Sequence, residues 1–430
     1  MTERQQAALV LAAPSSGSGK TVITLAVLRA LSNAGISVGS FKVGPDYIDP
    51  KFHSAANRSD CFNLDPWAMN AGQLDGVVTA GMKQKEFALA EGVMGLFDGV
   101  IGGGGSTADL ASSMEWPVVL IADCKGMSQS VAAIVRGFMG QRSDVSIVGV
   151  ILNRVGSIKH ERLLRSALTD IGCPVVGVIP RNTSLNLPSR HLGLVQAEEN
   201  TDLETFLENA AWVIEQNLDL DLLLRLVTGK MPKPEKLTCW AAPGQRIAIA
   251  KDEAFAFTYA HVLEQWLEEG AELSFFSPLA DEAPVENCDF IYLPGGYPEL
   301  HAETLGLASN WKNGLRSSAA NQTPIYAECG GYMALGEKLI DRQGVAHAMA
   351  GLLPVSTSFE KPKLHLGYRR MKTGAGEKSN GHEFHFASTV ANTCCEPLYQ
   401  AEDSEGVGLG IYGAKIGSVF GSFLHKITEI

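Results

Sequence analysis

Short apolar runs recur along the first half of the chain, and a longer stretch with helical spacing follows most of them. The runs are rich in Val, Ile and Ala: ALVLAA, SVGSFKV, EFALAEGVM, PVVLIAD, VSIVGVILN and PVVGVIP. The stretches between them include TVITLAVLRALSNAG and SQSVAAIVRGFMG. Continuous apolar strands that alternate with helices are typical of a parallel sheet covered on both faces. The pattern therefore predicts a doubly wound α/β domain.

This rhythm stops at residues 228–245, TGKMPKPEKLTCWAAPGQ, a segment with three prolines, two glycines and mixed charge. Such a composition is typical of a linker. The alternation then restarts with RIAIAKD, AFTYAHVLEQWLEEG, ELSFFSP, DFIYLPGG and PIYAECGG. We therefore expect a first domain over residues 1–228, a linker over 229–244 and a second α/β domain over 245–430.

Length and composition fit this division and exclude some functions. A chain of 430 residues exceeds the size of one core, and a net charge of −12 argues against broad binding to nucleic acid or anionic membranes. ALVLAA flows into a glycine-rich turn, so we interpret it as a strand and not as a signal peptide. No apolar stretch reaches the about 18–20 residues of a membrane span. The eight cysteines are scattered, with Cys394 and Cys395 as the one close pair, which indicates a reduced, cytoplasmic protein.

The first apolar run leads into AAPSSGSGKT at residues 12–21, which is typical of a phosphate-binding loop. Small residues let backbone N–H groups approach phosphate oxygens, and a helix start adds a favourable potential. Lys20 would reach the β- and γ-phosphates of ATP, and the Thr21 hydroxyl would bind Mg²⁺. Pro14 stands where the usual pattern has glycine, and the alternative is a glycine-rich turn without a ligand. The other residues expected to bind the nucleotide are Ser16, Gly17, Ser18 and Gly19.

Two acidic residues follow the next predicted strand, in FKVGPDYIDPKFH at residues 41–53. Asp46 and Asp49 would lie at the carboxyl edge of the sheet, where α/β proteins bind ligands. Carboxylates there hold Mg²⁺ directly or through water. Aspartates beside Pro and Gly are also common in ordinary turns, and the spacing does not decide between the two interpretations.

A third acidic position ends the apolar strand in LAEGVMGLFDG. A carboxylate at the end of a buried strand is costly unless it meets a cation or donors, so we favour a metal-binding or supporting role for Glu91. Asp98 could equally cap the following turn. The run GGGGSTADL at residues 102–110 is either a helix start capped by Ser106 or Thr107 or an anion site, and we favour the cap.

The segment PIYAECGGYM at residues 324–333 places Cys329 between an apolar strand and a helix-like stretch. A nucleophile on such a turn needs small neighbours, so that substrate can approach and backbone N–H groups can form an oxyanion hole. Gly295 and Gly296 of LPGGYPE, at the end of another strand, are candidate donors for that hole. A buried cysteine is usually a small hydrophobic residue, but the turn favours a nucleophile here.

A cysteine nucleophile needs a base, which is usually a histidine. His425 closes an apolar strand and would lie on the same sheet edge as Cys329. His382 and His385 in GHEFHFAS could instead bind a metal through their spacing of three residues. Their strand-like context and the lack of a clear third ligand make a metal site the weaker interpretation.

Several motifs occur in an order that resembles a known family: AAPSSGSGKT, KVGPDYIDPKFH, NLDPWAM, EGVMGLFDG, GMSQSVAAIVRGF, RHLGLV, LPGGYPELHA, AECGGYM and GHEFHFA. Together they resemble the a,c-diamide synthases of corrin biosynthesis, and the resemblance spans nearly the whole chain. ILNRVGS, AFAFTYAHVLEQW, ELSFFSPLADE and HLGYRR look most similar to the branch that acts on hydrogenobyrinic acid. The cobyrinic acid enzymes are its close siblings.

This resemblance implies an N-terminal ATPase domain like that of dethiobiotin synthetase and a C-terminal glutaminase domain of the class I type. In that family the cysteine of AECGG is the nucleophile and a histidine near the C-terminus raises its nucleophilicity, which corresponds to Cys329 and His425. Class I glutaminases commonly carry His-x-Glu, whereas this chain has His425, Lys426 and Ile427. The group that orients His425 is therefore left open. Pro14, by contrast, is the form that the loop takes in this family.

The resemblance thus implies an ATP- and glutamine-dependent amidoligase that acts on the a and c carboxylates of hydrogenobyrinate or cobyrinate. ATP would phosphorylate the carboxylate, and ammonia from glutamine would displace the phosphate. Thr21, Asp46 and Glu91 are the expected Mg²⁺ ligands. Tyr47 and Asp98 are candidates for contact with the nucleotide or the substrate.

Two alternative functions stay open. One is an amidoligase that acts on another tetrapyrrole, such as nickel-sirohydrochlorin. The other is a nucleotide-switched binding ATPase with a degenerate glutaminase domain, which the missing Glu of His-x-Glu would allow. The sequence also leaves open whether the corrin contains cobalt, which carboxylate is amidated first, how ammonia travels between the sites and whether the chain forms a homodimer.

Overall fold

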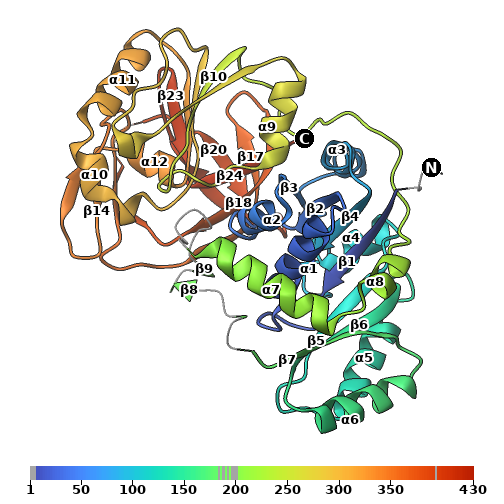
Figure 1. The fold of residues 1–430 in the computed structure, drawn as a ribbon. Coiled ribbons are helices and arrows are strands. Elements are labelled where there is room, and N and C mark those ends of the chain that lie inside the picture. Colours follow the sequence, from blue (N-terminus) through green and yellow to red (C-terminus); the bar gives the residue numbers. More distant parts are fainter. Residues whose placement is uncertain (1–5, 183–184, 186–188, 191–192, 195–201, 393–394) are drawn as a thin grey trace. The chain divides into compact units, whose positions relative to one another are not determined.

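The structure is a computed structural model that describes residues 6–182, 185, 189–190, 193–194, 202–392 and 395–430. The chain divides into two compact units, Met1–Leu237 and Thr238–Ile430, each with its own sheet and core (Figure 1). Among the described residues, no helix is both long and apolar enough to cross a membrane. Outside the described residues lie Cys394 and three members of the RHLGLV motif, His191, Leu192 and Val195.

The first unit is built on a seven-stranded parallel sheet in the order β3-β2-β4-β1-β5-β6-β7 (Figure 1). Its strands are β1 (Ala7–Ala12), β2 (Val38–Val43), β3 (Cys61–Leu64), β4 (Phe87–Glu91), β5 (Val118–Asp123), β6 (Ile147–Val155) and β7 (Val175–Pro180). Its helices are α1 (Lys20–Asn33), α2 (Asp49–Asn57), α3 (Ala71–Gly81), α4 (Thr107–Ser113), α5 (Ser130–Gln141), α6 (Ile158–Thr169), α7 (Leu203–Asn217) and α8 (Leu220–Leu226). Two short strands, β8 (Ser189–Arg190) and β9 (Gly193–Leu194), pair with each other. The predicted doubly wound fold is confirmed.

The strand order places a ligand-binding edge beside β1. From β1 the chain first builds the side of the sheet that holds β2 and β3, returns through β4, and then builds the other side from β5 to β7. Open α/β sheets bind ligands at the carboxyl ends of their strands where the order reverses in this way. Residues 13–19 follow β1, residues 44–48 follow β2, and Glu91 ends β4, so all three lie at that edge.

A buried arginine fixes the helix that follows the phosphate loop. Arg29 of α1 is fully buried, and its guanidinium donates to the carbonyls of Ala55 and Ala56 on α2. It also donates to Glu204 and Glu208 on α7, each at 2.8 Å. Five N–H donors in one plane satisfy this many acceptors. The helix α1 is therefore tied to both of its neighbours.

The second unit contains a six-stranded sheet in the order β11-β10-β12-β13-β23-β22, parallel except for β22. Its strands are β10 (Arg246–Ala250), β11 (Glu272–Phe276), β12 (Phe290–Leu293), β13 (Ile325–Glu328), β22 (Ala414–Ile416) and β23 (Val419–Ser422). Its helices are α9 (Ala260–Glu268), η2 (Pro278–Ala280), η3 (Pro298–Leu300), α10 (Ala302–Leu307), α11 (Ser309–Ala320) and α12 (Gly330–Leu335). This part matches the β/α rhythm of the sequence.

Two further sheets in this unit have no counterpart in that rhythm. One is antiparallel, in the order β21-β20-β17-β18-β24, with β17 (His365–Thr373), β18 (Lys378–His385), β20 (Tyr399–Glu402), β21 (Gly408–Tyr412) and β24 (Leu424–Glu429). The other, β15-β14-β16-β19, contains β14 (Lys338–Ile340), β15 (Ala346–Ala348), β16 (Val355–Ser358) and β19 (Ser388–Asn392). A single residue, Phe423, separates β23 from β24. The parallel and the antiparallel sheet are therefore joined by continuous backbone.

Candidate active sites

The phosphate loop, residues 13–19, connects β1 to α1 and is held by the end of β6. Asn153 Nδ2 donates to the Ser18 carbonyl at 2.8 Å, and Arg154 donates to the Gly17 carbonyl at 2.9 Å. Gly19 has φ of 87°, and a Cβ added to it would collide with Asn153 Nδ2. Glycine is therefore required where the loop turns into the helix.

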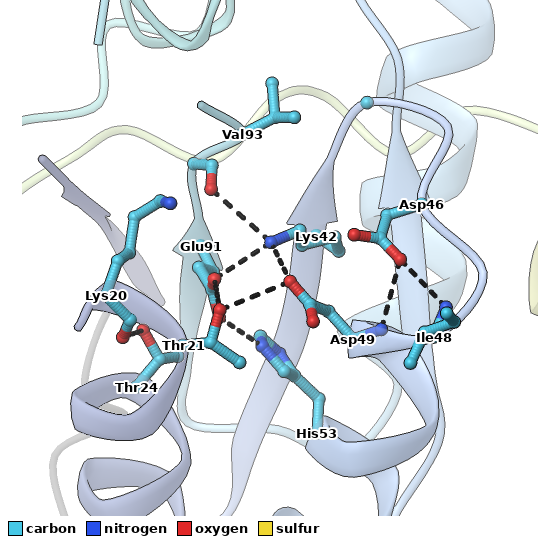
Figure 2. Close-up of polar contacts among 12 residues, drawn as sticks. Lys20, Thr21, Thr24, Lys42, Asp46, Ile48, Asp49, His53, Glu91 and Val93 are labelled. Carbon is cyan, nitrogen blue, oxygen red and sulfur yellow. Dashed lines mark hydrogen bonds and ion pairs between the residues drawn. The ribbon is translucent and has the colours of Figure 1, made fainter. Parts of the chain in front are cut away.

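The Thr21 side chain, on the second residue of α1, faces two carboxylates that come from other elements (Figure 2). Its hydroxyl donates to Glu91 Oε1 at 2.7 Å and lies 3.3 Å from Asp49 Oδ2. Glu91 ends β4 and Asp49 begins α2, and both residues are buried. One hydroxyl and two carboxylates thus meet at the carboxyl edge of the sheet. Mg²⁺ prefers oxygen donors of this kind.

Lys42 of β2 lies between the same two carboxylates (Figure 2). Its Nζ donates to Asp49 Oδ2 at 2.5 Å and to Glu91 Oε1 at 2.8 Å. Burial on its own would lower the pKa of Lys42, but the charges of Asp49 and Glu91 raise it above its ordinary value. Lys42 is therefore a buried cation that neutralises the carboxylate pair.

The loop lysine has a different environment. Lys20 is buried, and burial lowers its pKa; the charge of Glu91 opposes this shift, and the charge of Lys42 adds to it. In Figure 2 no dashed line reaches the Lys20 ammonium group, whereas the Lys42 ammonium group has hydrogen bonds to two carboxylates. An anionic phosphate beside Lys20 would offset the desolvation of its charge.

His53 of α2 supports Glu91 from the other side (Figure 2). Its Nε2 lies 2.6 Å from Glu91 Oε2, and its Nδ1 lies 2.9 Å from the Ser40 hydroxyl. Burial opposes the charged ring, but contacts with Cys61 and Glu91 raise the pKa of His53 to about 10. Glu91 itself is fully buried, yet Lys42 and His53 hold its pKa well below the ordinary value. The carboxylate at the end of β4 is therefore ionised.

Asp46 and Asp49 have different hydrogen-bond partners. Asp46 Oδ1 accepts hydrogen bonds from the backbone N–H groups of Ile48, at 2.8 Å, and Asp49, at 3.1 Å, and so caps the start of α2 (Figure 2). Burial and the neighbouring charge of Asp49 raise the pKa of Asp46 to about 6. Of the three expected Mg²⁺ ligands, Thr21 and Glu91 are hydrogen-bonded to each other. The aspartate that lies against the Thr21 hydroxyl is Asp49 and not the expected Asp46.

The remaining candidates of the first unit occupy the loops after β2 and β4. Tyr47 is buried beside Asp46. Asp98 is exposed, and its Oδ2 accepts from the Gly95 backbone at 2.8 Å, as a turn-capping residue does. Ser106 caps α4 by accepting from the Asp109 backbone, which matches the favoured interpretation of residues 102–110.

Two functional candidates, Lys42 and His53, were outside the sequence-based set. Lys42 stands inside the apolar run SVGSFKV, and His53 follows the two aspartates in FKVGPDYIDPKFH. A lysine inside a buried strand needs an anionic partner, so its position was a usable signal. His53 gave none, because its contact with Glu91 joins residues 38 positions apart.

In the second unit, Cys329 forms a strained turn between β13 and α12. Its backbone has φ of 44° and ψ of −104°, a conformation that residues with a Cβ rarely adopt. Its N–H donates to the Ser422 carbonyl at 2.8 Å, which ties the turn to the end of β23. A Cβ on Gly331 would collide with the Leu293 carbonyl, so glycine lets α12 approach β12 closely. The strand-to-helix turn expected from the sequence is thus present with Cys329 at its apex, and the side chain there is buried.

Burial determines the resting state of this thiol. Burial raises the pKa of Cys329, and the nearby charge of Glu299 raises it further. The Sγ atom lies 3.7 Å from the Phe384 carbonyl on β18. The thiol therefore needs a base before it can attack a substrate.

His425 of β24 reaches the same region through strand pairing. It lies opposite His382 of β18, two residues from Phe384, whose carbonyl contacts the Cys329 thiol. Its ring packs so closely over Gly295 that a Cβ there would collide with Cε1. Its Nδ1 is 3.7 Å from Glu328 Oε2. Cys329, His425 and Gly295 thus lie in the same region of the second unit, near the ends of β13, β12 and β23.

The loop with Gly295 and Gly296 lies against the cysteine turn. A Cβ on Gly330 would approach the Gly296 backbone N to 2.9 Å and Pro298 Cδ to 2.8 Å. Backbone groups of this loop are therefore near neighbours of Cys329. The two glycines remain candidate oxyanion-hole donors.

His382 and His385 do not form a pair. Residues three apart on a strand point to opposite faces, and burial lowers the pKa of His382 to about 3. His385 instead joins His365 and Glu383 in a cluster whose ligand atoms lie within 4.8 Å of one another. The rings of His365 and His385 are stacked and nearly parallel, and Arg369 binds Glu383 at 2.6 Å. The arginine already balances the charge of this cluster, which is typical of an ion-pair network.

Two family models match the chain. One, described as a CobQ/CobB/MinD/ParA nucleotide binding domain, matches residues 9–195, and the other, described as a CobB/CobQ-like glutamine amidotransferase domain, matches residues 246–429. These matches coincide with the sheet that carries the phosphate loop and the sheet that carries Cys329. The fold and the sites define a glutamine-dependent amidating ligase.

Curated relatives narrow this class. Three proteins named hydrogenobyrinate a,c-diamide synthase are similar to this chain. The protein from Brucella suis is 51% identical over 429 residues, that from Brucella anthropi 50% over 430 residues, and that from Rhizobium meliloti 48% over 423 residues. Each match covers 97% of this chain and 98% of the relative. The chain belongs to the hydrogenobyrinate a,c-diamide synthase family. This confirms the family resemblance, the fold class and the enzyme class expected from the motifs, and it gives no support to a binding ATPase.

Proposed function

We propose that the chain uses ATP and glutamine to amidate the a and c carboxylates of hydrogenobyrinate, the reaction for which its relatives are named. The observation that carries this proposal is about 50% identity to those relatives over 97% of the chain. The partners would be ATP, glutamine and the corrin acid, with cobyrinate as the alternative acceptor and a homodimer left open. Six of the described cysteines are free thiols, Cys61, Cys124, Cys173, Cys239, Cys288 and Cys329, which supports the cytoplasm as the location.

The first unit would activate the carboxylate. A corrin carboxylate oxygen attacks the γ-phosphorus of ATP, which gives an acyl phosphate and ADP; ammonia then attacks the acyl carbon and expels inorganic phosphate. Lys20 and the loop N–H groups would bind the phosphates. Lys42 would add a second positive charge where the transferred group becomes more negative. Tyr47 and Asp98 stay candidates for contact with substrate or nucleotide.

The oxygen cluster of the first unit fits Mg²⁺. Thr21, Asp49 and Glu91 would hold the ion, because the Thr21 hydroxyl lies against both carboxylates and both carboxylates already bind a cation, the Lys42 ammonium group. Asp46, which caps α2, would act through water. An ion held by these residues would supply positive charge that offsets the negative charge of the ATP phosphates.

The second unit would release ammonia from glutamine. His425 takes the proton of the Cys329 thiol, and the sulfur attacks the side-chain amide carbon. The N–H groups near Gly295 and Gly296 would stabilise the oxyanion. His425 then gives the proton to the leaving ammonia, and water hydrolyses the glutamyl thioester to glutamate.

The test is direct. Purified protein is incubated with Mg·ATP and glutamine and with either hydrogenobyrinate or cobyrinate, and the acceptor is followed by mass spectrometry. Two successive replacements of OH by NH₂ on hydrogenobyrinate are expected, with the metal-free acceptor turned over faster. If neither acceptor changes mass, the proposal is wrong.

A further inference from the structure

The acid that orients His425 is expected two residues after it, but that position is Ile427. Ile427 is fully buried, and its carbonyl accepts from the ring of His261 at 3.0 Å. Position 427 is therefore part of the core of the unit. Another carboxylate lies much nearer to His425: Glu328, the residue directly before Cys329.

Glu328 is a buried carboxylate that accepts three hydrogen bonds. Its Oε1 accepts from the Tyr326 hydroxyl at 3.0 Å and from the Lys426 backbone N–H at 2.9 Å. Its Oε2 accepts from the Tyr292 hydroxyl at 2.7 Å. Glu328 is 1% exposed, so these three hydrogen bonds replace the water that its charge has lost.

In their contacts with Glu328, the Tyr292 and Tyr326 hydroxyls are hydrogen-bond donors. Burial, together with the negative charge of Glu328, raises the pKa of Tyr292 and of Tyr326 well above the ordinary value. Tyr399 extends the cluster, with its hydroxyl 3.2 Å from that of Tyr326. Because the phenols keep their protons, Tyr292 and Tyr326 each donate a hydrogen bond to the Glu328 carboxyl group.

The remaining acceptor capacity of Glu328 faces the histidine. His425 Nδ1 is 3.7 Å from Oε2, and such contacts are often long in a resting enzyme and shorten when substrate binds. The backbone holds both partners in place, because Lys426, next to His425, donates its N–H to the same carboxylate. A carboxylate at Nδ1 keeps the proton on that nitrogen and leaves Nε2 free to accept another.

We propose that Glu328 is the positioning residue for His425. This inference rests on the glutaminase half of the proposed function. Glu328 accepts the Nδ1–H of His425, fixes the ring with Nε2 free to take the Cys329 proton, and stabilises the imidazolium that forms. The chain thus supplies from β13 the acid that His-x-Glu would place on the strand of the histidine.

The variant Glu328→Gln tests this directly, because it keeps the shape of the side chain. Its amide oxygen can still accept from Tyr326 and Lys426, but its NH₂ group cannot accept Nδ1–H. We expect glutaminase kcat to fall about 10²–10⁴-fold, with KM for glutamine changed less than about threefold. Amidation with added ammonium, which bypasses Cys329, should stay at the wild-type rate.

The second variant, Glu328→Asp, keeps the charge but shortens the side chain by one methylene. We expect its kcat to lie between those of wild type and Glu328→Gln, again with little change in KM. A purely structural role would change melting temperature and both activities together. If Glu328→Gln does not fold, Glu328→Asp carries the test through its kcat.

The outcomes separate the two proposals. Wild-type glutaminase kcat in either folded variant, or an equal loss in both, would overturn the role of Glu328 while leaving the proposed function intact. Absence of amidation by the wild-type protein with both glutamine and ammonium would overturn the proposed function itself. Loss of ammonium-dependent amidation in folded Glu328→Gln would also contradict a role confined to His425.

Discussion

The Thr21 hydroxyl lies 2.7 Å from Glu91 Oε1, although 70 positions separate the two residues in the chain. The sheet order brings them together, because β4, which ends at Glu91, is the direct neighbour of β1, which leads into α1. The proposed Mg²⁺ site depends on this pair, because it combines a hydroxyl with an ionised carboxylate. Several expected outcomes follow from it and from the second site.

Replacing Glu91 with glutamine should abolish carboxylate activation. The change removes the negative charge that faces Thr21, Lys42 and His53, so ATP-dependent amidation should fall at least about 100-fold with glutamine and with ammonium alike. Steady-state ADP release is the measurement. Glu86→Gln is the matched control, because Glu86 is exposed and directly precedes β4, at the end opposite to Glu91. Equal activity of the two variants would contradict the assignment.

Lys42→Met should make stability depend on Mg²⁺. Without the ammonium group, Asp49 loses the cation that binds it and Glu91 keeps only His53, which costs on the order of 3–5 kcal/mol. Added Mg²⁺ should recover part of this loss and raise the melting temperature of the variant more than that of wild type. Lys159→Met, at an exposed position of α6, serves as the control. An equal Mg²⁺ effect in Lys42→Met and wild type would argue against a cation site at these oxygens.

Cys329→Ala should separate the two half-reactions. Glutamine-dependent amidation should fall to background, because no thioester can form, while ammonium-dependent amidation should persist. Cys288→Ala, a buried thiol of the same unit, should keep both activities. Loss of both activities in a folded Cys329→Ala protein would contradict the proposed division of labour.

Gly295→Ala should disable the base without touching the thiol. The added methyl group would occupy the space of the His425 ring, so glutaminase kcat should fall about 100-fold or more. Gly374→Ala is the control, because a Cβ there meets no atom within 4 Å. Normal glutaminase activity in Gly295→Ala would show that the ring moves away without cost.

Asp46→Asn should change how stability depends on pH. In the folded protein the pKa of Asp46 is raised from 3.8 to about 6, so protons bind more tightly to the native state. Its favourable contribution is present below about pH 4 and is lost as the pH rises through about 6. The asparagine is neutral and keeps its Oδ1 for the cap of α2. Its stability relative to wild type should therefore increase between pH 4 and 7, as urea unfolding would show; a constant difference would refute the shift.

The sequence alone predicted the elements that a local pattern specifies. Apolar runs and turn chemistry located the phosphate loop, the strand that ends at Glu91 and the turn at Cys329, because each is set by neighbours in the chain. The sequence-based choice of Mg²⁺ ligand was Asp46, whereas the aspartate that lies against the Thr21 hydroxyl is Asp49. That choice depends on where α2 begins: Asp46 caps the helix, and Asp49, in its first turn, points toward Thr21.

Contacts between distant strands were beyond a single sequence. His425 lies on β24, which pairs with β18 in an antiparallel sheet. Both strands have mixed polar and apolar residues, so the sequence carries no periodic signal for this pairing. The proposed role of Glu328 has the same origin. Its place beside Cys329 was visible in AECGG, but its distance to His425 arises from the turn at Phe423.

The single residue between β23 and β24 has a consequence for biosynthesis of the chain. The backbone N–H of Cys329 donates to the Ser422 carbonyl, and His425 follows Ser422 by three positions, so the same late segment completes the surroundings of the thiol and supplies the histidine. A polypeptide still emerging from the ribosome at residue 420 has the thiol but no base. Under the proposed mechanism, such an unfinished chain would not hydrolyse glutamine.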